Sequence, residues 1–296
     1  MMMIRRRMMI VVRRHNYQKK YFSVTSTKTV ITSRSNPQIK TFRRLAKTRD
    51  FVRIEGSRHV KDAMKHSMKL QYLFTTPEHS IVTTTQDKHY HVTESVMKHL
   101  STQKSPSGVL ALFERPEAMN EFPTTTTTTT TNRVVLICDG VSDPGNLGTL
   151  IRTACAFDCD AVITTRGGEG ADPWNEKCVR STASAILSIP VLEWELQNER
   201  NSIDRWLRKN TTNVYVADTS QHNVSYDEVE FLSHNQEHDI AIVLGNEGKG
   251  VSSLFKDLYD DVSTYVRIPI VSESLNVGVA GGIILSEIRR QENKLL

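Results

Sequence analysis

The chain has 296 residues, enough for one large domain or two medium ones with a buried core. It contains no run of 18 or more apolar residues, which argues against a transmembrane helix. Removing the eight positive charges of the first thirty residues from the formal net charge of +5 leaves −3 for the remainder, so any RNA affinity there must come from local patches.

The first thirty residues are rich in arginine and hydroxyl side chains, and the chain has no Asp or Glu before residue 50. This composition is typical of an organellar transit peptide. The apolar segment at residues 8–12 is too short, and too closely flanked by arginines, for a secretory signal. We therefore predict a transit peptide at residues 1–30 and a mitochondrial matrix location. A basic arm that contacts nucleic acid is the alternative.

The four cysteines, Cys138, Cys155, Cys159 and Cys178, form no CxxC pair, and no histidine follows them at metal-ligand spacing. We expect free, buried thiols in a reducing compartment and no metal site.

Helical and strand-like patterns alternate over the next part of the chain. Helices are expected from Pro37, from Gly56 and from Thr93 to Leu100, and strands over residues 51–55, 70–74, 80–84 and 108–113. This alternation predicts a small α/β/α domain at residues 33–115. Residues 116–132 are predicted to be a linker, because the eight threonines at 124–131 have no apolar face to bury.

A second domain is predicted at residues 133–296, where apolar runs alternate with helical patterns. Strands are expected at residues 133–139, 160–164, 189–191, 214–217, 239–244 and 265–268. Helices are expected at residues 149–157, 181–187, 198–209 and 252–259. A last apolar helix follows Ser274 and Asn276, whose side chains can cap it. The continuous apolar runs indicate a mainly parallel sheet, and such sheets bind ligands at the carboxyl ends of their strands.

Three loops follow strands of this second domain, at residues 143–152, 245–250 and 268–276. The first lacks the GxGxxG dinucleotide fingerprint, and the second is not a GxxxxGK[ST] phosphate loop. A nicotinamide-dependent oxidoreductase is therefore disfavoured. Taken singly, each loop could be a structural turn, but their shared position at one sheet edge favours a site.

Together the loops resemble the three motifs of the SpoU, or TrmH-type, RNA ribose 2′-O-methyltransferases of the SPOUT superfamily. The motifs are DPGNLGTLIRTA at residues 143–154, IVLGNEGKGVS at 242–252, and IPI followed by SLNVGVA within 268–280. The resemblance extends from Val134 to Gln291. The preceding part resembles the L30e-like substrate-binding domain of rRNA members, at residues 35–37, 52–56 and 107–111.

The resemblance implies an α/β fold with a C-terminal trefoil knot, preceded by the small L30e-like domain. It implies S-adenosylmethionine as methyl donor, bound at Gly245, Ile268 and Leu275. It also implies a homodimer whose active site borrows residues across a two-fold interface. The catalytic positions carried over from the family are Arg152, Asn146, Glu247, Ser274 and Asn276.

The role of Arg152 is open between two chemistries. The family pattern assigns it to the ribose hydroxyl, either as a base or by holding the adjacent phosphate. Arginine normally stays protonated, which favours phosphate anchoring over the role of a base. The proton would then go to another acceptor.

The sequence thus predicts an S-adenosylmethionine-dependent 2′-O-methyltransferase that acts on a guanosine of mitochondrial large-subunit rRNA and binds no membrane. A tRNA methyltransferase and a catalytically silent RNA-binding assembly factor of the same fold are alternatives. The candidates for RNA binding are Arg34, Lys40, Arg43, Arg44, Arg58 and Arg180. A solvated basic helix, or for Arg180 a surface salt bridge, is the other interpretation.

Overall fold

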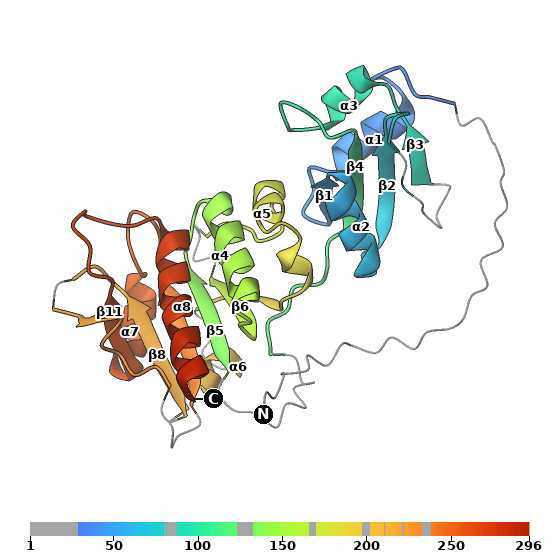
Figure 1. Cartoon of the computed structure of the whole chain (residues 1–296). Coiled ribbons are helices and arrows are strands. Elements are labelled where there is room, and N and C mark those ends of the chain that lie inside the picture. Colours follow the sequence, from blue (N-terminus) through green and yellow to red (C-terminus); the bar gives the residue numbers. More distant parts are fainter. Residues whose placement is uncertain are drawn as a thin grey trace, which may run out of the picture.

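The computed structural model describes residues 29–79, 81, 88–122, 133–165, 170–196, 202–209, 211–220, 222–232 and 238–295. The chain forms two sheets, each with helices on its faces (Figure 1). The predicted transit peptide up to residue 28, the threonine tract, and the strand expected at 80–84 except Ile81 lie outside the described residues. The domain limits therefore stay predictions.

The small sheet has four strands in the order β1-β4-β2-β3. Its elements are α1 (Pro37–Leu45), β1 (Phe51–Glu55), α2 (Ser57–Lys65), β2 (Leu70–Thr75), β3 (His89–His91), α3 (Glu94–Leu100) and β4 (Val109–Glu114). Strand β4 pairs antiparallel with β1 and β2, and β3 runs parallel to β2.

The small sheet carries helices on both faces because the side chains of β4 alternate. Ala111 and Phe113 belong to the same apolar cluster as Val60 of α2, whereas Leu110 and Leu112 belong to the cluster formed with α1 and α3. Helix α1 begins where expected, since the Asn36 side chain accepts a hydrogen bond from the Gln38 backbone N–H.

The large sheet has seven strands in the order β7-β6-β5-β10-β8-β11-β9, and every neighbouring pair is parallel. The predicted parallel sheet is thereby confirmed. Its first elements are β5 (Val134–Asp139), α4 (Pro144–Ala156), β6 (Ala161–Thr165), α5 (Glu176–Ser181), the 3-10 helix η2 (Ala185–Leu187) and β7 (Val191–Trp194). The remaining elements are α6 (Ser202–Leu207), β8 (Thr212–Ala217), β9 (Val224–Ser225), β10 (Asp239–Leu244), α7 (Ser253–Tyr259), η3 (Asp260–Val262), β11 (Ser263–Arg267) and α8 (Val277–Leu295).

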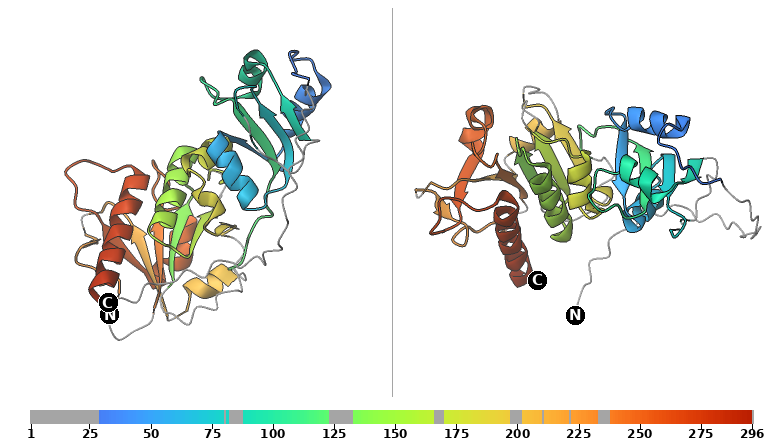
Figure 2. Two further views of the ribbon diagram at one scale, coloured as in Figure 1. Left: turned by 45° about the vertical axis from the view of Figure 1, so that its right-hand side comes forward. Right: turned by 90° about the horizontal axis from the view of Figure 1, so that it is seen from above.

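Helices cover both faces of the large sheet, which explains the continuous apolar runs of its strands. Val134, Leu136 and Cys138 of β5 pack with α4, α5 and α8, whereas Val135 and Ile137 pack with α6 and α7. Helices α4 and α8 lie side by side on one face (Figures 1 and 2). None of the described helices combines the length and the apolar character needed to span a bilayer.

The helix expected at residues 149–157 begins earlier than predicted, at Pro144. The Asp143 side chain caps it by accepting a hydrogen bond from the Asn146 N–H, and Pro144 suits the first turn. Gly145 and Gly148 suggested a loop but lie within the helix, where they make room for α5. Asn146 is consequently a helix residue.

The region after β6 also differs from the sequence-based expectation. The helix predicted at 181–187 is replaced by α5 and η2, because Ala183 and Ser184 adopt left-handed backbone conformations, with φ of 48° and 75°, that end α5. The strand predicted at 189–191 instead occupies Val191–Trp194. The short edge strand β9 was not predicted.

Candidate active site

The three loops singled out in the sequence meet at the carboxyl edge of the large sheet, and Glu247 joins two of them. Its Oε2 accepts hydrogen bonds from the backbone N–H and hydroxyl of Ser142, at 3.1 and 3.0 Å. Its Oε1 accepts from the Asp143 N–H at 3.2 Å and from Asn146 Nδ2 at 2.9 Å. The carboxylate therefore fixes the loop after β5 and the first turn of α4.

Asn146 extends the connection to the third loop. Its Oδ1 accepts a hydrogen bond from Asn276 Nδ2 at 2.9 Å. Asn276 Oδ1 in turn accepts from the backbone N–H groups of Gly278 and Val279, at 2.9 and 3.3 Å, and so caps α8. A continuous chain of polar contacts thus runs from Glu247 through Asn146 to Asn276, and we call these three residues the polar network.

Glu247 is held in its ionised form. Its partial burial by itself raises the pKa, but the hydrogen bonds from Asn146 and from the backbone and hydroxyl of Ser142 outweigh that effect and leave the pKa below its usual value. An ionised Glu247 can only accept hydrogen bonds, which orients the Asn146 amide with Nδ2 toward Glu247 and Oδ1 toward Asn276.

The loop after β10 is held closed by its own backbone. Asn246 and Gly250 exchange two N–H···O hydrogen bonds of 2.9 Å, and Asn246 Nδ2 donates to the Gly140 carbonyl at 2.9 Å. A Cβ on Gly245 would lie 2.2 Å from both the Gly250 carbonyl carbon and the Val251 nitrogen. Only glycine fits at position 245, because the chain folds back against it.

A cavity of about 470 Å³ opens beside this network, within the size range of small-molecule sites. It contains all three residues that the resemblance assigned to the cofactor, Gly245, Ile268 and Leu275, together with Glu247 and Ser274. Its apolar wall includes Leu244, Val266, Ile268, Ile270, Leu275, Val277 and Ala280. Such a wall can cover a flat aromatic base, and the exposed backbone of residues 245–250 can hydrogen-bond to a polar ligand. The residues present therefore fit S-adenosylmethionine.

One part of this cavity was not predicted from the sequence. Asp218 and Thr219, which follow β8, line it, and so does Lys256 of α7. Lys256 Nζ lies 3.3 Å from Asp218 Oδ2. The sequence signal that could have identified Asp218 was its position directly after another parallel strand, because the ends of parallel strands meet at one sheet edge. No cluster of His, Cys, Asp and Glu able to hold a metal ion occurs among the described residues.

Arg152 and Ser274 lie outside the polar network. Arg152 is exposed on α4, and along the described parts of the chain it makes no hydrogen bond or ion pair. It lies six residues after Asn146, about 9 Å along the helix and about 120° around it. Ser274 is exposed and lines the cavity, but its side chain does not cap α8, contrary to the sequence-based expectation; Asn276 is the cap.

Four of the six predicted RNA-binding residues share one concave surface, which we call the basic concavity. It has a volume of about 370 Å³ and is lined by Arg34, Lys40, Arg43, Arg44 and Lys47. Desolvation first, and then the charges of Arg43 and Arg34, lower the pKa of the neighbouring His99. The contributions of the two arginines to this shift indicate a locally positive surface, as binding of phosphate groups requires.

The other two predicted RNA-binding residues lie elsewhere. Arg58 is highly exposed on α2, 4.0 Å from Asp62. Arg180 projects from α5 toward the small sheet, and its Nη1 lies 3.7 Å from Glu176 Oε1. The structure therefore does not unite all six cations on one surface.

Two family models match the chain. The SpoU rRNA methylase family matches residues 133–286, and the MRM3-like substrate binding domain matches residues 36–111. The first match takes in all residues of the polar network, and the second takes in all residues of the basic concavity except Arg34.

Several known proteins are similar over most of the chain. The 23S rRNA (guanosine(2553)-2′-O)-methyltransferase RlmP of Bacillus subtilis is 31% identical over 268 residues, which cover 88% of this chain and 98% of that protein. The mitochondrial rRNA methyltransferase 3 of Homo sapiens is 27% identical, with coverages of 81% and 67%. The S-adenosylmethionine-bound structure of an rRNA methyltransferase from Sinorhizobium meliloti superposes with a TM-score of 0.71, at 26% identity and coverages of 88% and 97%.

Proposed function

The chain belongs to the SpoU rRNA methylase family, and from this premise we propose that it methylates a guanosine 2′-hydroxyl in mitochondrial large-subunit rRNA. It is an S-adenosylmethionine-dependent RNA 2′-O-methyltransferase. The observation that carries the proposal is the meeting of Glu247, Asn146 and Asn276 in one network beside the cavity that contains Gly245 and Leu275.

The chain's own residues have two tasks in the reaction. Bound S-adenosylmethionine supplies an electrophilic methyl group on a sulfonium, and in-line attack requires a positioned ribose hydroxyl that loses its proton. Glu247 and Asn276 hold the Asn146 amide in one orientation at the cavity edge. The exposed guanidinium of Arg152 suits anchoring of the phosphate next to the target ribose, since arginine presents several fixed donors to phosphate oxygens.

The basic concavity supplies the second part of the substrate site. Its five cations project from α1 and from the residues directly before and after it, beside the small sheet, which does not carry the polar network. An RNA that contacts both the basic concavity and the polar network must span the two sheets. This requirement favours a large structured RNA. The likeness to the Bacillus subtilis enzyme supports a guanosine in large-subunit rRNA, and the likeness to the human enzyme supports a mitochondrial location.

We also propose that the enzyme works as a homodimer. Two large apolar side chains are exposed in this region, Val271 within the third loop and Val279 in the first turn of α8. Exposed apolar side chains that gather into a patch can mark a protein–protein interface, and the family resemblance implies a two-fold partner. A second copy placed there would also bring its own residues toward the site. An active monomer in a sedimentation experiment would contradict the homodimer proposal.

The test uses purified protein, S-adenosylmethionine with a radiolabelled methyl group, and unmodified large-subunit rRNA. We expect label on one ribose 2′-oxygen of a guanosine, and loss of that mark from mitochondrial rRNA in cells that lack the protein. Transfer to tRNA alone would indicate a tRNA methyltransferase. Binding of S-adenosylmethionine without transfer to any RNA would favour a silent assembly factor, and binding of NAD in calorimetry would revive the oxidoreductase hypothesis.

A further inference from the structure

Helix α5 lies between the small sheet and helix α4 (Figure 1). It belongs to a segment, residues 172–181, that is rich in charged and capping side chains. Asn175 caps the helix, since its Oδ1 accepts a hydrogen bond from the Lys177 N–H. Its first two residues, Glu176 and Lys177, make contacts in two different directions.

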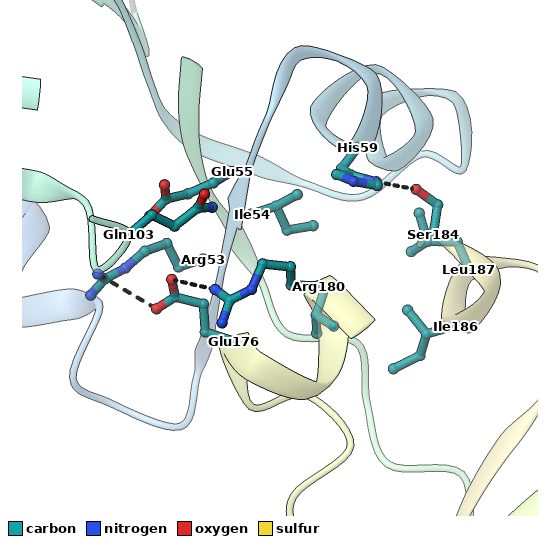
Figure 3. A pocket seen from close by; sticks show the side chains of 11 residues that line it. Arg53, Ile54, Glu55, His59, Gln103, Glu176, Arg180, Ser184, Ile186 and Leu187 are labelled. Carbon is teal, nitrogen blue, oxygen red and sulfur yellow. Dashed lines mark hydrogen bonds and ion pairs between the residues drawn. The ribbon is translucent and has the colours of Figure 1, made fainter. Parts of the chain in front are cut away.

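Glu176 contacts the small sheet. Its Oε2 lies 3.6 Å from Arg53 Nη1 of β1, and its Oε1 accepts a hydrogen bond from the hydroxyl of Thr102. Figure 3 shows Glu176 between Arg53 and Arg180, and it also shows His59 of α2 against Ser184 after α5. The His59 Nδ1 to Ser184 Oγ distance is 2.9 Å. The position of α5 is thus tied to that of the RNA-binding half of the chain.

Lys177 contacts the active site. Its ammonium group donates to Asp143 Oδ2. Asp143 in turn contacts two members of the polar network, because its Oδ1 accepts from the Asn146 N–H at 2.9 Å and its own N–H donates to Glu247 Oε1 at 3.2 Å. The hydrogen bond from Lys177 and then that from Asn146 lower the pKa of Asp143 below its usual range, so the cap stays ionised.

Two glycines of α4 let α5 approach this closely. A Cβ on Gly145 would lie 3.2 Å from Lys177 Cε and 2.8 Å from Asp143 Oδ1. A Cβ on Gly148 would lie 2.5 Å from the Cys178 carbonyl oxygen. The Lys177 side chain therefore passes directly over the start of α4.

We propose that Lys177 is a positioning residue for methyl transfer, which holds Asp143 so that Asn146 and Glu247 keep their reactive arrangement. The proposal rests on the proposed function. Helix α5 then couples two tasks through adjacent residues: Glu176 orients the RNA-binding sheet and Lys177 orients the polar network. The side chains of Lys177 and Asp143 are 52% and 42% exposed. An ion pair this exposed contributes little to stability, so its loss should change the geometry of the site more than the fold.

The experiment compares three variants of the full chain in the transfer assay with large-subunit rRNA. Lys177→Met keeps the apolar stem over Gly145 and removes the charge, and Lys177→Arg keeps a donor for Asp143. Glu176→Gln weakens the contact with Arg53 and leaves Lys177 unchanged. We measure kcat, KM for RNA, S-adenosylmethionine affinity by calorimetry, and the thermal unfolding midpoint.

We expect Lys177→Met to lower kcat about tenfold, because small displacements of positioned groups cost rate. Its KM, cofactor affinity and unfolding midpoint should stay close to wild type, and Lys177→Arg should recover most of the rate. Glu176→Gln should raise KM for RNA with little change in kcat. A kcat of Lys177→Met within twofold of wild type would overturn the proposal, as would the same kinetic pattern in Glu176→Gln. If the wild-type chain transfers no methyl group to any RNA, the proposed function itself fails.

Discussion

The polar network and the basic concavity achieve their organisation in different ways. In the network, Asn146 contacts Glu247 and Asn276, which lie 101 and 130 residues further along the chain. Each amide or carboxylate there has a defined partner. The basic concavity draws its cations from residues 34–47, and its side chains are exposed. Two of them also have polar partners: Arg34 donates to the Ser95 hydroxyl, and Arg43 Nη1 lies 2.9 Å from His99 Nε2. The network depends on the fold of the large sheet, whereas the concavity depends on the composition of one short segment.

This difference predicts different responses to substitution. Removing a group from the network leaves partners without a hydrogen bond and changes the geometry of the others, so the effects on rate should be large and not additive. Removing one cation from the concavity takes away one phosphate contact among several, so the effects on RNA affinity should be modest, additive and dependent on salt.

The largest effect is expected at Arg152. Arg152→Ala should lower transfer at least a thousandfold, because an anchored phosphate or an activated hydroxyl is lost, while S-adenosylmethionine affinity should stay near wild type. Because Arg152 is exposed on α4, its replacement should leave the fold intact. Arg152→Lys separates the two roles, since a lysine still provides a charge for phosphate but not the planar donor set. Loss of cofactor binding in either variant would show that the residue belongs to the cavity instead.

A second large effect is expected at Gly245. In Gly245→Ala the new methyl group would overlap backbone atoms of Gly250 and Val251, which cannot move without opening the loop. We expect S-adenosylmethionine affinity to fall ten- to a hundredfold and stability to fall by about 1–3 kcal/mol, as for other overpacked positions. Calorimetry and thermal unfolding measure both.

Gly282→Ala is the matched control for Gly245→Ala. Its Cβ would lie 3.8 Å from Thr153 Cγ2, an ordinary van der Waals distance, within the helix α8. Alanine has a higher helix propensity than glycine, so the stability of the Gly282→Ala variant should not fall. Equal losses in the two variants would show that the space around Gly245 does not decide cofactor binding.

These glycines also show how far the sequence could predict the site. Three loops at the ends of parallel strands had to meet at one sheet edge, and the cofactor residues Gly245, Ile268 and Leu275 do share one cavity. Gly145 and Gly148 were misinterpreted as loop residues. Glycine is needed at these positions because α5 packs against them, which is a tertiary contact. A single sequence contains no signal for which segment will approach a glycine.

The same limit applies to the charged residues. The composition of residues 34–47 was enough to predict a basic surface, since neighbouring cations on a short helix share its exposed side. It could not place Arg180, which faces the small sheet beside Glu176, or Asp218, which joins the cavity from β8. Those placements depend on how α5 and β8 pack, and the periodicity of a segment does not contain that information.

A moderate effect is expected in the basic concavity. Lys40→Ala and Arg44→Ala should each weaken RNA binding about three- to fivefold and reduce the salt dependence of log Kd by about one ion. The rate at saturating RNA should not change. Lys65→Ala is the control, because it removes an exposed cation from α2, on the opposite face of the small sheet. An equal loss of affinity in Lys65→Ala would mean that total charge, rather than this surface, attracts the RNA.

The smallest effect concerns the charge of Glu247. Its pKa is depressed in the folded chain, so its ionised form stabilises the fold at pH values above the ordinary value of 4.5, and this contribution disappears as the pH falls through the folded-state pKa. Glu247→Gln should therefore be less stable than wild type at neutral pH, by less than about 1 kcal/mol since solvent screens an exposed carboxylate. The difference should shrink as the pH falls below 4.5, which denaturant unfolding at a series of pH values measures. A constant difference across that range would mean that the hydrogen-bonding shape of Glu247, rather than its charge, holds Ser142 and Asn146 in place.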